Sequence, residues 1–234
     1  MMIQKRTFPA RQLASMEQWA YDTIKDRILT LELRPGATIT EAELAKSLDV
    51  SKTPLRAALM QLERDELVES APYKGSWVRP VTLESIQHLF QLREAIEGFA
   101  VEAFALVKTP EQLSKLQNIE RSRLEAVEQN QVDLAIVRDA EFHSYPVQAL
   151  GNPHLDRLMI NISDHRRRLR HLLADHLPAP SPYAITERHN ALLAAFEKGE
   201  AEQVRAIVVD GIRALLGVAE EAAAKGALEV STDR

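Results

Sequence analysis

The sequence predicts a mainly helical protein of two domains. Residues 1–80 are expected to form three helices and a small β-hairpin, and residues 81–234 an antiparallel bundle of six helices. Three observations predict this fold. Two amphipathic helices lie close together in residues 39–62, two short strand-like runs follow them, and only helical periodicity is evident after Val81. Hydrophobic residues make up 45% of the 234, which is enough for buried cores.

The first helix is expected from Met16 to Leu31, after a polar arm in residues 1–15. The run Leu33-Arg34-Pro35-Gly36 then ends it, because proline and glycine interrupt helices. The side chains expected to face the core are Trp19, Ala20, Ile24, Ile28 and Leu31.

A second, shorter helix is expected in residues 39–50, where Thr40 and Glu43 have the spacing of a capping box. Only Asp49-Val50 separates this helix from Ser51. Two helices joined so tightly must cross at a steep angle, as in a helix-turn-helix.

The third helix, residues 51–62, combines a buried stripe with a polar amino-terminal end. Leu55, Leu59 and Leu62 recur at i, i+4 and i+7 and can bury one side of the helix. The polar side chains of its first turn lie away from this stripe and are therefore available to a binding partner. Either Ser51 caps this helix, or Thr53 does so with Pro54 at the first helical position. In both cases the backbone N–H groups of the first turn, which have no partner within the helix, favour the binding of a phosphate. The side chains expected to contact DNA are Ser51, Lys52, Thr53 and Arg56. The alternative is a helical hairpin that binds nothing.

Residues 67–70 and 75–79 are short apolar-alternating runs around a turn, which predicts a hairpin that serves as the wing of a winged helix. Lys74 and Gly75 would lie at its tip, where a cation and a flexible backbone can approach a phosphate or a minor groove. The alternative is a solvated turn lysine.

The six helices of the bundle begin at about residues 83, 109, 132, 152, 181 and 201. Three of them share one start signal, a capping residue followed by proline. These pairs are Thr109-Pro110, Asn152-Pro153 and Ser181-Pro182. The last helix is expected to end near Lys225, with a frayed tail after Gly226.

The charge of the chain is unevenly divided. Its net charge of −5 argues against nucleic-acid binding, but residues 1–80 hold 12 Lys and Arg against 11 Asp and Glu. Residues 81–234 hold 17 against 23. A nearly neutral domain can still bind DNA, because phosphate affinity depends on where its cations lie.

No cysteine is present, which excludes a disulfide framework and a thiolate metal site. No apolar run approaches the roughly 20 residues that span a bilayer, and residues 1–6 lack an apolar signal core. A cytoplasmic protein with no membrane partner is therefore expected.

Roughly the first third of the chain, from Ala20-Tyr21 to the Lys-Gly wing, resembles the winged-helix domain of GntR-type transcriptional regulators, on the evidence of the helix order, the Ser-Lys-Thr-Pro-Leu-Arg run and that wing. The resemblance implies that Ser51, Lys52, Thr53 and Arg56 contact DNA, supported by Lys74 and Gly75. The chain departs from the family at three positions. Lys52 stands where arginine is commoner, Glu66 replaces a glycine, and Ala42 replaces an arginine of some members.

Asp139 and His143 stand at i, i+4 in the sixth helix, close enough to share a ligand or to form a surface pair. The nearby Leu150-Gly151-Asn152-Pro153 and the later Glu187-Arg188-His189 resemble the FadR C-terminal (FCD) branch of the family. In many FCD proteins an Asp and three His bind a divalent metal. The resemblance assigns Asp139, His143 and His189 to the first three ligands, while Gly211 stands in the place of the fourth.

Two outcomes therefore remain open. Either zinc, nickel or manganese is held by one carboxylate and two imidazoles, or the metal has been lost and the pocket binds its effector directly. Arg93 matches a family arginine that reaches toward an acid, although an Arg93–Glu97 surface pair is the alternative. The run His165–Arg170 is expected on a solvated or interface-facing surface, with one arginine allowed to face the pocket. Four other imidazoles are expected to face solvent: His154, His165, His171 and His176.

The sequence therefore favours a dimeric, ligand-responsive transcriptional regulator. Its expected partners are a pseudo-palindromic double-stranded DNA operator, a small carboxylate effector and a second copy of the chain. One alternative is a metal-dependent enzyme in which the Asp-His-His group activates water, but no general base or nucleophile motif accompanies it. Another is a DNA-binding domain fused to a purely structural bundle.

Overall fold

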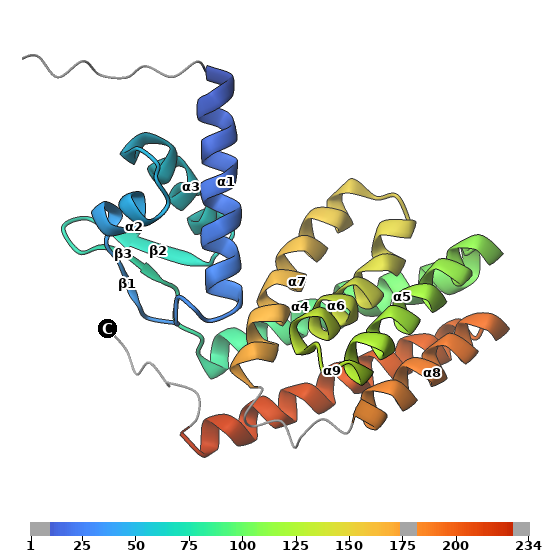
Figure 1. Cartoon of the computed structure of the whole chain (residues 1–234). Coiled ribbons are helices and arrows are strands. Elements are labelled where there is room, and N and C mark those ends of the chain that lie inside the picture. The colour runs from blue at the N-terminus through green and yellow to red at the C-terminus, as the bar shows by residue number, and fades with distance from the viewer. Residues whose placement is uncertain (1–9, 174–181, 227–234) are drawn as a thin grey trace, which may run out of the picture. The chain divides into compact units, whose positions relative to one another are not determined.

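The computed structural model describes residues 10–173 and 182–226. They form two compact units, Met1–Pro80 and Val81–Arg234, each with its own hydrophobic core. The mainly helical fold predicted from the sequence is confirmed (Figure 1).

The first unit has three helices and a small sheet. Its elements are α1 (Ala10–Leu29), β1 (Thr38–Ile39), α2 (Glu41–Ser47), α3 (Lys52–Arg64), β2 (Val68–Ala71) and β3 (Gly75–Val78). The antiparallel sheet has the strand order β1-β3-β2, so the predicted hairpin carries one additional strand. Helices α1 and α3 pack against each other over a core that includes Ile24, Ile28, Leu55 and Leu62.

Helix α1 differs from its prediction at both ends. It begins at Ala10, so the expected polar arm is helical from that residue, and residues 1–9 lie outside the described part. Trp19 is 48% exposed rather than in the core, because the buried stripe follows Ala20, Tyr21, Ile24 and Ile28. The hydroxyl of buried Tyr21 donates a hydrogen bond of 2.5 Å to Asp65 Oδ2. Leu31 lies beyond the helix with φ of 64°.

The capping box predicted at Thr40 is wrong. Thr40 is the N-cap residue of α2, but its side chain makes no capping hydrogen bond. Glu41 and Glu43 still place negative charge at the amino-terminal end of the helix dipole.

The departure of Glu66 from the family glycine has a visible consequence. Its φ is 60°, in the left-handed region where a side chain costs about 1–2 kcal/mol and glycine costs little. The carboxylate of Glu66 accepts a hydrogen bond of 2.8 Å from Arg79, which holds the strained turn against the wing.

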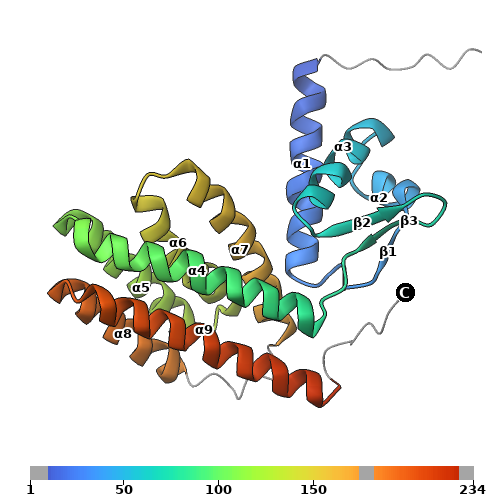
Figure 2. The same cartoon turned by 180° about the vertical axis from the view of Figure 1, so that it is seen from behind.

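The second unit is all-helical within the described residues (Figure 2). Its helices are α4 (Leu83–Val107), α5 (Pro110–Glu128), α6 (Val132–Ala149), α7 (Pro153–Leu172), α8 (Pro182–Lys198) and α9 (Ala201–Ala224). The predicted starts at Thr109 and Asn152 are confirmed, since each side chain accepts a hydrogen bond from a first-turn amide. Ser181 and the tail after Gly226 lie outside the described residues.

Helix α4 packs against α9, and α5 packs against α6; these packed pairs build much of the core of this unit. Figure 2 shows α4 and α9 running side by side, with α8 along the other side of α9. Buried side chains of this core include Phe90, Phe104, Phe142 and Phe196. None of the helices in the described ranges is long and apolar enough to cross a membrane.

Candidate functional site

Helix α3 buries one face and leaves its first turn open. Leu55 and Leu62 are fully buried, whereas the side chains expected to contact DNA are exposed. Ser51 is the N-cap residue with extended backbone, but its hydroxyl makes no capping hydrogen bond. Pro54 is the third residue of the helix rather than the first. The cap assigned to Thr53 is therefore wrong, and the exposed side chains of the first turn are Ser51, Lys52, Thr53 and Arg56.

Arg56 is tied to the preceding helix. Its Nε donates a hydrogen bond of 2.9 Å to Oε2 of Glu41, although 63% of the Arg56 side chain is exposed. The Glu41 carboxylate thus holds the Arg56 guanidinium at the surface. To contact DNA, Arg56 would have to exchange this carboxylate for a base edge or a phosphate.

The wing presents its tip to solvent. Lys74 and Gly75 are both exposed, and Gly75 has φ of 80°, which glycine adopts easily. Tyr73, beside them, is fully exposed with φ of 65°. Nothing in the sequence singles out this tyrosine, because a single exposed aromatic residue is normal on a protein surface.

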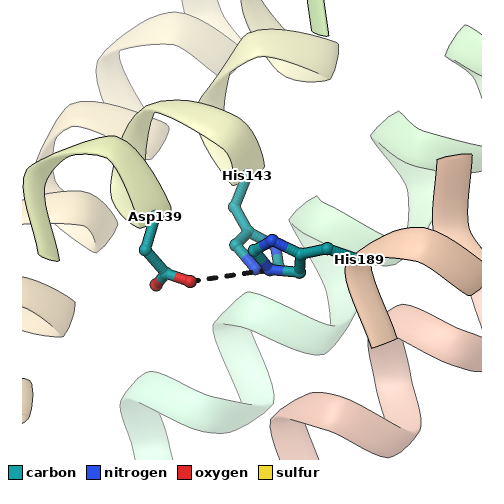
Figure 3. Close-up of side chains that lie close together, drawn as sticks. All are labelled: Asp139, His143 and His189. Atoms are coloured by element: carbon teal, nitrogen blue, oxygen red, sulfur yellow. Dashed lines mark ion pairs between the residues drawn. The ribbon is translucent and has the colours of Figure 1, made fainter. Parts of the chain in front are cut away.

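In the helical unit, α6 and α8 bring together the three residues expected to bind metal. Asp139 and His143 come from successive turns of α6, and His189 comes from α8 (Figure 3). One ligand atom from each residue lies within 4.8 Å of the other two. Asp139 and His189 are 6% and 2% exposed, so the surface pair considered for Asp139 is wrong.

Glu120 of α5 orients His189. Nδ1 of His189 donates to Oε2 of Glu120 across 2.6 Å, and Nε2 lies 3.5 Å from Oδ1 of Asp139. Burial raises the pKa of Glu120, but hydrogen bonds from Arg123 and His189 outweigh it, so the pKa lies below its ordinary value. Glu120 is therefore an anion that leaves Nε2 as the free ligand atom. Phe142 stacks on the imidazole with ring centroids 4.2 Å apart, which fixes its plane.

Asp139 lies beside two arginines of α7. Its Oδ2 pairs with Arg166 and lies 3.5 Å from Arg170, while Oδ1 is buried and accepts no hydrogen bond from the described residues. Burial raises the pKa of Asp139, but the charges of Arg166 and Arg170 hold it well below its usual range. Burial lowers the pKa of Arg166 to about 10, which leaves it charged at neutral pH.

The solvated surface expected for residues 165–170 is thus wrong for its buried arginines, Arg166 and Arg168, each 2% exposed. A signal was available, because Arg166 falls in the buried stripe formed by Met159, Ile162, Leu169 and Leu173. Of the remaining imidazoles, His154 is exposed as expected, His165 and His171 are partly buried, and His176 lies outside the described residues.

Arg93 and His143 meet at Glu97. Nε of Arg93 donates a hydrogen bond of 2.6 Å to Oε1 of Glu97, and Nδ1 of His143 lies 3.8 Å from Oε2. The i, i+4 pair considered for Arg93 is present, but it is buried rather than at the surface. Burial and the charge of Arg166 lower the pKa of His143 well below its ordinary value, so this imidazole is neutral at pH 7.

These side chains surround a small cavity of about 30 Å³. Its polar lining, from four helices, consists of Arg93, His143, Arg166, Arg170, Arg188 and His189, and α9 adds Gly211 with four apolar residues. A Cβ at Gly211 would lie 2.9 Å from Cδ and 3.3 Å from Nε of Arg188, so this arginine lies in the space of a side chain at position 211. Arg188 gave no signal as a cavity residue in the sequence.

The arrangement offers two kinds of chemistry. A carboxylate and two imidazoles with one imidazole backed by a carboxylate form a donor set that suits a divalent transition metal. The guanidinium groups around it suit a carboxylate or another oxyanion. The cavity can therefore hold an anion, with or without a metal beside it.

Two families match the chain. Residues 17–78 match the bacterial regulatory proteins of the gntR family, and residues 88–214 match the FCD domain. An uncharacterized HTH-type transcriptional regulator of Bacillus subtilis, YdhC, is 29% identical over 159 residues, covering 67% of this chain and 71% of the relative. The HTH-type transcriptional repressor RspR of Escherichia coli is 25% identical over 190 residues, covering 81% and 82%.

Solved structures share the fold. A GntR-type transcriptional regulator from Rhodococcus sp. RHA1 superposes with a TM-score of 0.74 at 22% identity, covering 88% of this chain and 98% of that one. McbR/YncC of E. coli superposes with a TM-score of 0.75 at the same identity and coverage.

Proposed function

Since the chain belongs to the GntR family of bacterial transcriptional regulators, in the branch with an FCD domain, we propose that it is a dimeric, ligand-responsive regulator. Its winged helix binds a pseudo-palindromic operator, and its helical domain senses a small organic acid. The family is one of DNA-binding regulators and not of enzymes, which removes the alternative of a metal-dependent hydrolase.

The exposed first turn of α3 supports the DNA-binding residues. Ser51, Lys52 and Thr53 offer hydroxyl, ammonium and amide donors to phosphates, and Arg56 can read the O6 and N7 atoms of guanine. Lys74 and Gly75 at the tip of the wing would approach a neighbouring phosphate.

A stripe of apolar side chains on α4 supports the dimer. Leu92, Phe99 and Leu106 are 37%, 57% and 71% exposed and recur every seven residues. Ile96 and Ala103, half-buried, complete a spacing of four and three residues. This is the pattern by which two helices pack along a seam, so a second copy of α4 is the occupant we assign to the stripe.

One observation supports acid sensing above the others. Arg93 and Arg166 are each 2% exposed and line the cavity, yet NH1 of Arg93 and both Nε and NH1 of Arg166 donate no hydrogen bond within the described residues. A buried donor without an acceptor costs about 1–3 kcal/mol, and more when charged. An effector carboxylate in the cavity would accept from these groups.

A divalent metal is the finer part of the proposal. Asp139, His143 and His189 would hold it, because their ligand atoms converge and the buried Oδ1 of Asp139 accepts no hydrogen bond from the residues described. When bound, such a metal supplies a Lewis acid that an effector oxygen can join. Within the protein, Glu120 orients His189 so that its Nε2 points toward Asp139 and His143, while Arg93 and Arg166 would hold the effector carboxylate in place.

The test starts from the whole chain. An operator is selected from random DNA duplexes, and its binding is followed by fluorescence anisotropy while short carboxylic acids are added. We expect a duplex with two half-sites to be selected, and at least one acid to change its affinity. Selection of no sequence, or no response to any acid at millimolar concentration, contradicts the corresponding half of the proposal.

A further inference from the structure

We propose that the cavity selects effectors with two carboxylate groups, and that Arg188, packed over Gly211, is the residue that determines this preference. This inference rests on the acid sensing proposed above and adds the charge class of the acid. It uses three observations: the charge count around the cavity, its unpaired inner donors and the contact between Arg188 and Gly211.

The cavity carries an excess of positive charge. Four arginines line it, Arg93 and Arg166 on its buried side and Arg170 and Arg188 toward solvent. Within the described residues, two carboxylates form ion pairs with these arginines: Glu97 with Arg93, and Asp139 with Arg166 and Arg170. Glu120 is already occupied by Arg123 and His189.

The four guanidinium groups therefore outnumber the two paired carboxylates by two positive charges. Charges this close to a low-dielectric interior require a counter-ion. A ligand with two negative charges balances the cavity, whereas a monocarboxylate leaves one cation unmatched.

The inner donors define the first carboxylate subsite. NH1 of Arg93 and the Nε and NH1 atoms of Arg166 are buried without an acceptor among the described residues, and both side chains line the cavity. Two guanidinium groups can each donate to a carboxylate in a planar fork, which is the geometry that arginine favours.

Arg188 defines the second subsite. Arg188 comes from α8, one residue before His189, and it is exposed, which places it at the mouth of the cavity that it lines. Its Cδ, Nε and NH1 atoms all lie within 3.3 Å of where a Cβ of residue 211 would be. The absence of a side chain at Gly211 therefore leaves the space in which the end of the Arg188 side chain lies, at the edge of the cavity.

The size of the cavity limits the ligand. About 30 Å³ accommodates one or two water molecules, so a long acid cannot be enclosed. A short dicarboxylate would place one carboxylate on the inner arginines and the other at the mouth, between Arg170 and Arg188, with outward movement of Arg188 making the room.

The experiment compares acids of equal carbon number on the full chain by isothermal titration calorimetry. Malonate is paired with propionate, and succinate with butyrate; inorganic phosphate is a dianion without carboxylates. The wild-type protein should bind one of the dicarboxylates at least about tenfold more tightly than its monocarboxylate partner, since each charge-assisted hydrogen bond lost has that effect. The titrations are repeated after dialysis against EDTA, and the preference should remain.

Four variants assign the preference to Arg188. Arg188→Gln should reduce dicarboxylate affinity about tenfold and leave the monocarboxylate unchanged, and Arg188→Lys should retain part of the preference. Gly211→Ala keeps the charge but forces the end of the Arg188 side chain to shift, so it should weaken the preference by less than Arg188→Gln does. Arg121→Gln, at an exposed arginine of α5 outside the cavity, is the matched control and should bind as wild type. Melting temperatures confirm that each variant is folded.

The outcomes separate the two proposals. If propionate binds as tightly as malonate and butyrate as tightly as succinate, the dicarboxylate preference is wrong and acid sensing stands. If phosphate binds more tightly than every dicarboxylate, or Arg188→Gln retains the preference, the inference is also wrong. If no acid binds and none alters operator affinity, acid sensing itself fails.

Discussion

Single residues decide what each surface can bind. The i, i+4 spacing of Asp139 and His143 was readable in the sequence, and the family resemblance added His189; the structure brings the three together and adds Glu120, which orients His189. The arginines could not be assigned in the same way, because a run of cations usually lies in solvent. Only the helical frame, in which Arg166 shares a stripe with buried residues, places it in the interior.

Arg56 and Lys74 should contribute differently to DNA binding. If Arg56 reads a base edge, Arg56→Ala should cost about 1–3 kcal/mol and weaken sequence preference. Lys74→Ala should weaken binding to all duplexes alike and reduce the salt dependence, because a phosphate contact releases counterions. Anisotropy titrations with operator and scrambled duplexes at several salt concentrations measure both. Equal and sequence-independent losses would refute the assignment.

If Asp139, His143 and His189 hold a metal, Gly211→His should supply a fourth ligand. Elemental analysis and metal titration should then show tighter metal binding than in the wild type. His189→Ala in the same chain should cancel much of the gain. The new side chain must also displace Arg188, so dicarboxylate preference should fall as metal affinity rises.

Gly211→Ala is the control for that change, since it displaces Arg188 and strengthens the helix by up to about 1 kcal/mol without adding a ligand. The metal assignment fails if no divalent metal is found in either the wild type or Gly211→His, and if alanine at Asp139 and His143 leaves effector binding unchanged.

At the scale of elements, long helices were predictable and short pieces were not. The start expected for α4, at about residue 83, agrees with the one observed, and the Thr109-Pro110 and Asn152-Pro153 starts were correct because proline at the first turn restricts the chain locally. Strand β1 has two residues, too few for an alternating pattern. It forms because Gly36 N donates to Val78 O and Val78 N to Ala37 O, both at 2.9 Å, which are tertiary contacts.

Thr109 and Thr40, which each stand at the start of a helix, allow the contribution of a side-chain cap to stability to be tested. Thr109 accepts from Gln112 N and belongs to a complete capping box, whereas Thr40 makes no capping hydrogen bond. Thr109→Ala should therefore lower the free energy of unfolding by about 1 kcal/mol. Thr40→Ala should change it by less than about 0.5 kcal/mol. Urea unfolding followed by circular dichroism measures both, and equal losses would show that the caps do not differ.

For the whole molecule, the division at residue 80 separates two chemistries. The first unit exposes cations on one short helix and a wing, while the second buries two arginines, Arg93 and Arg166, beside a cavity. The net charge of the whole chain conceals this division. Only the charge counted separately for residues 1–80 and 81–234 showed that the first unit is compatible with DNA binding.

The α4 stripe predicts how two copies assemble. Phe99→Glu, in the middle of the stripe, should weaken self-association by at least about 30-fold, as expected for an apolar residue central to an interface. Val132→Glu, at an equally exposed valine of α6, is the control and should leave the dimer intact. Light scattering and sedimentation at micromolar concentration report the masses. A wild-type monomer, bound once per operator, would contradict the dimer.

The pair between Glu41 and Arg56 also affects how an operator is found among other DNA. A guanidinium already held by a carboxylate gains little from an arbitrary phosphate, because one partner is exchanged for another. Guanine offers two acceptors in the fork geometry and can win that exchange. Glu41 would thus act as an internal competitor that shortens the time spent on random sequence and widens the ratio of specific to non-specific affinity.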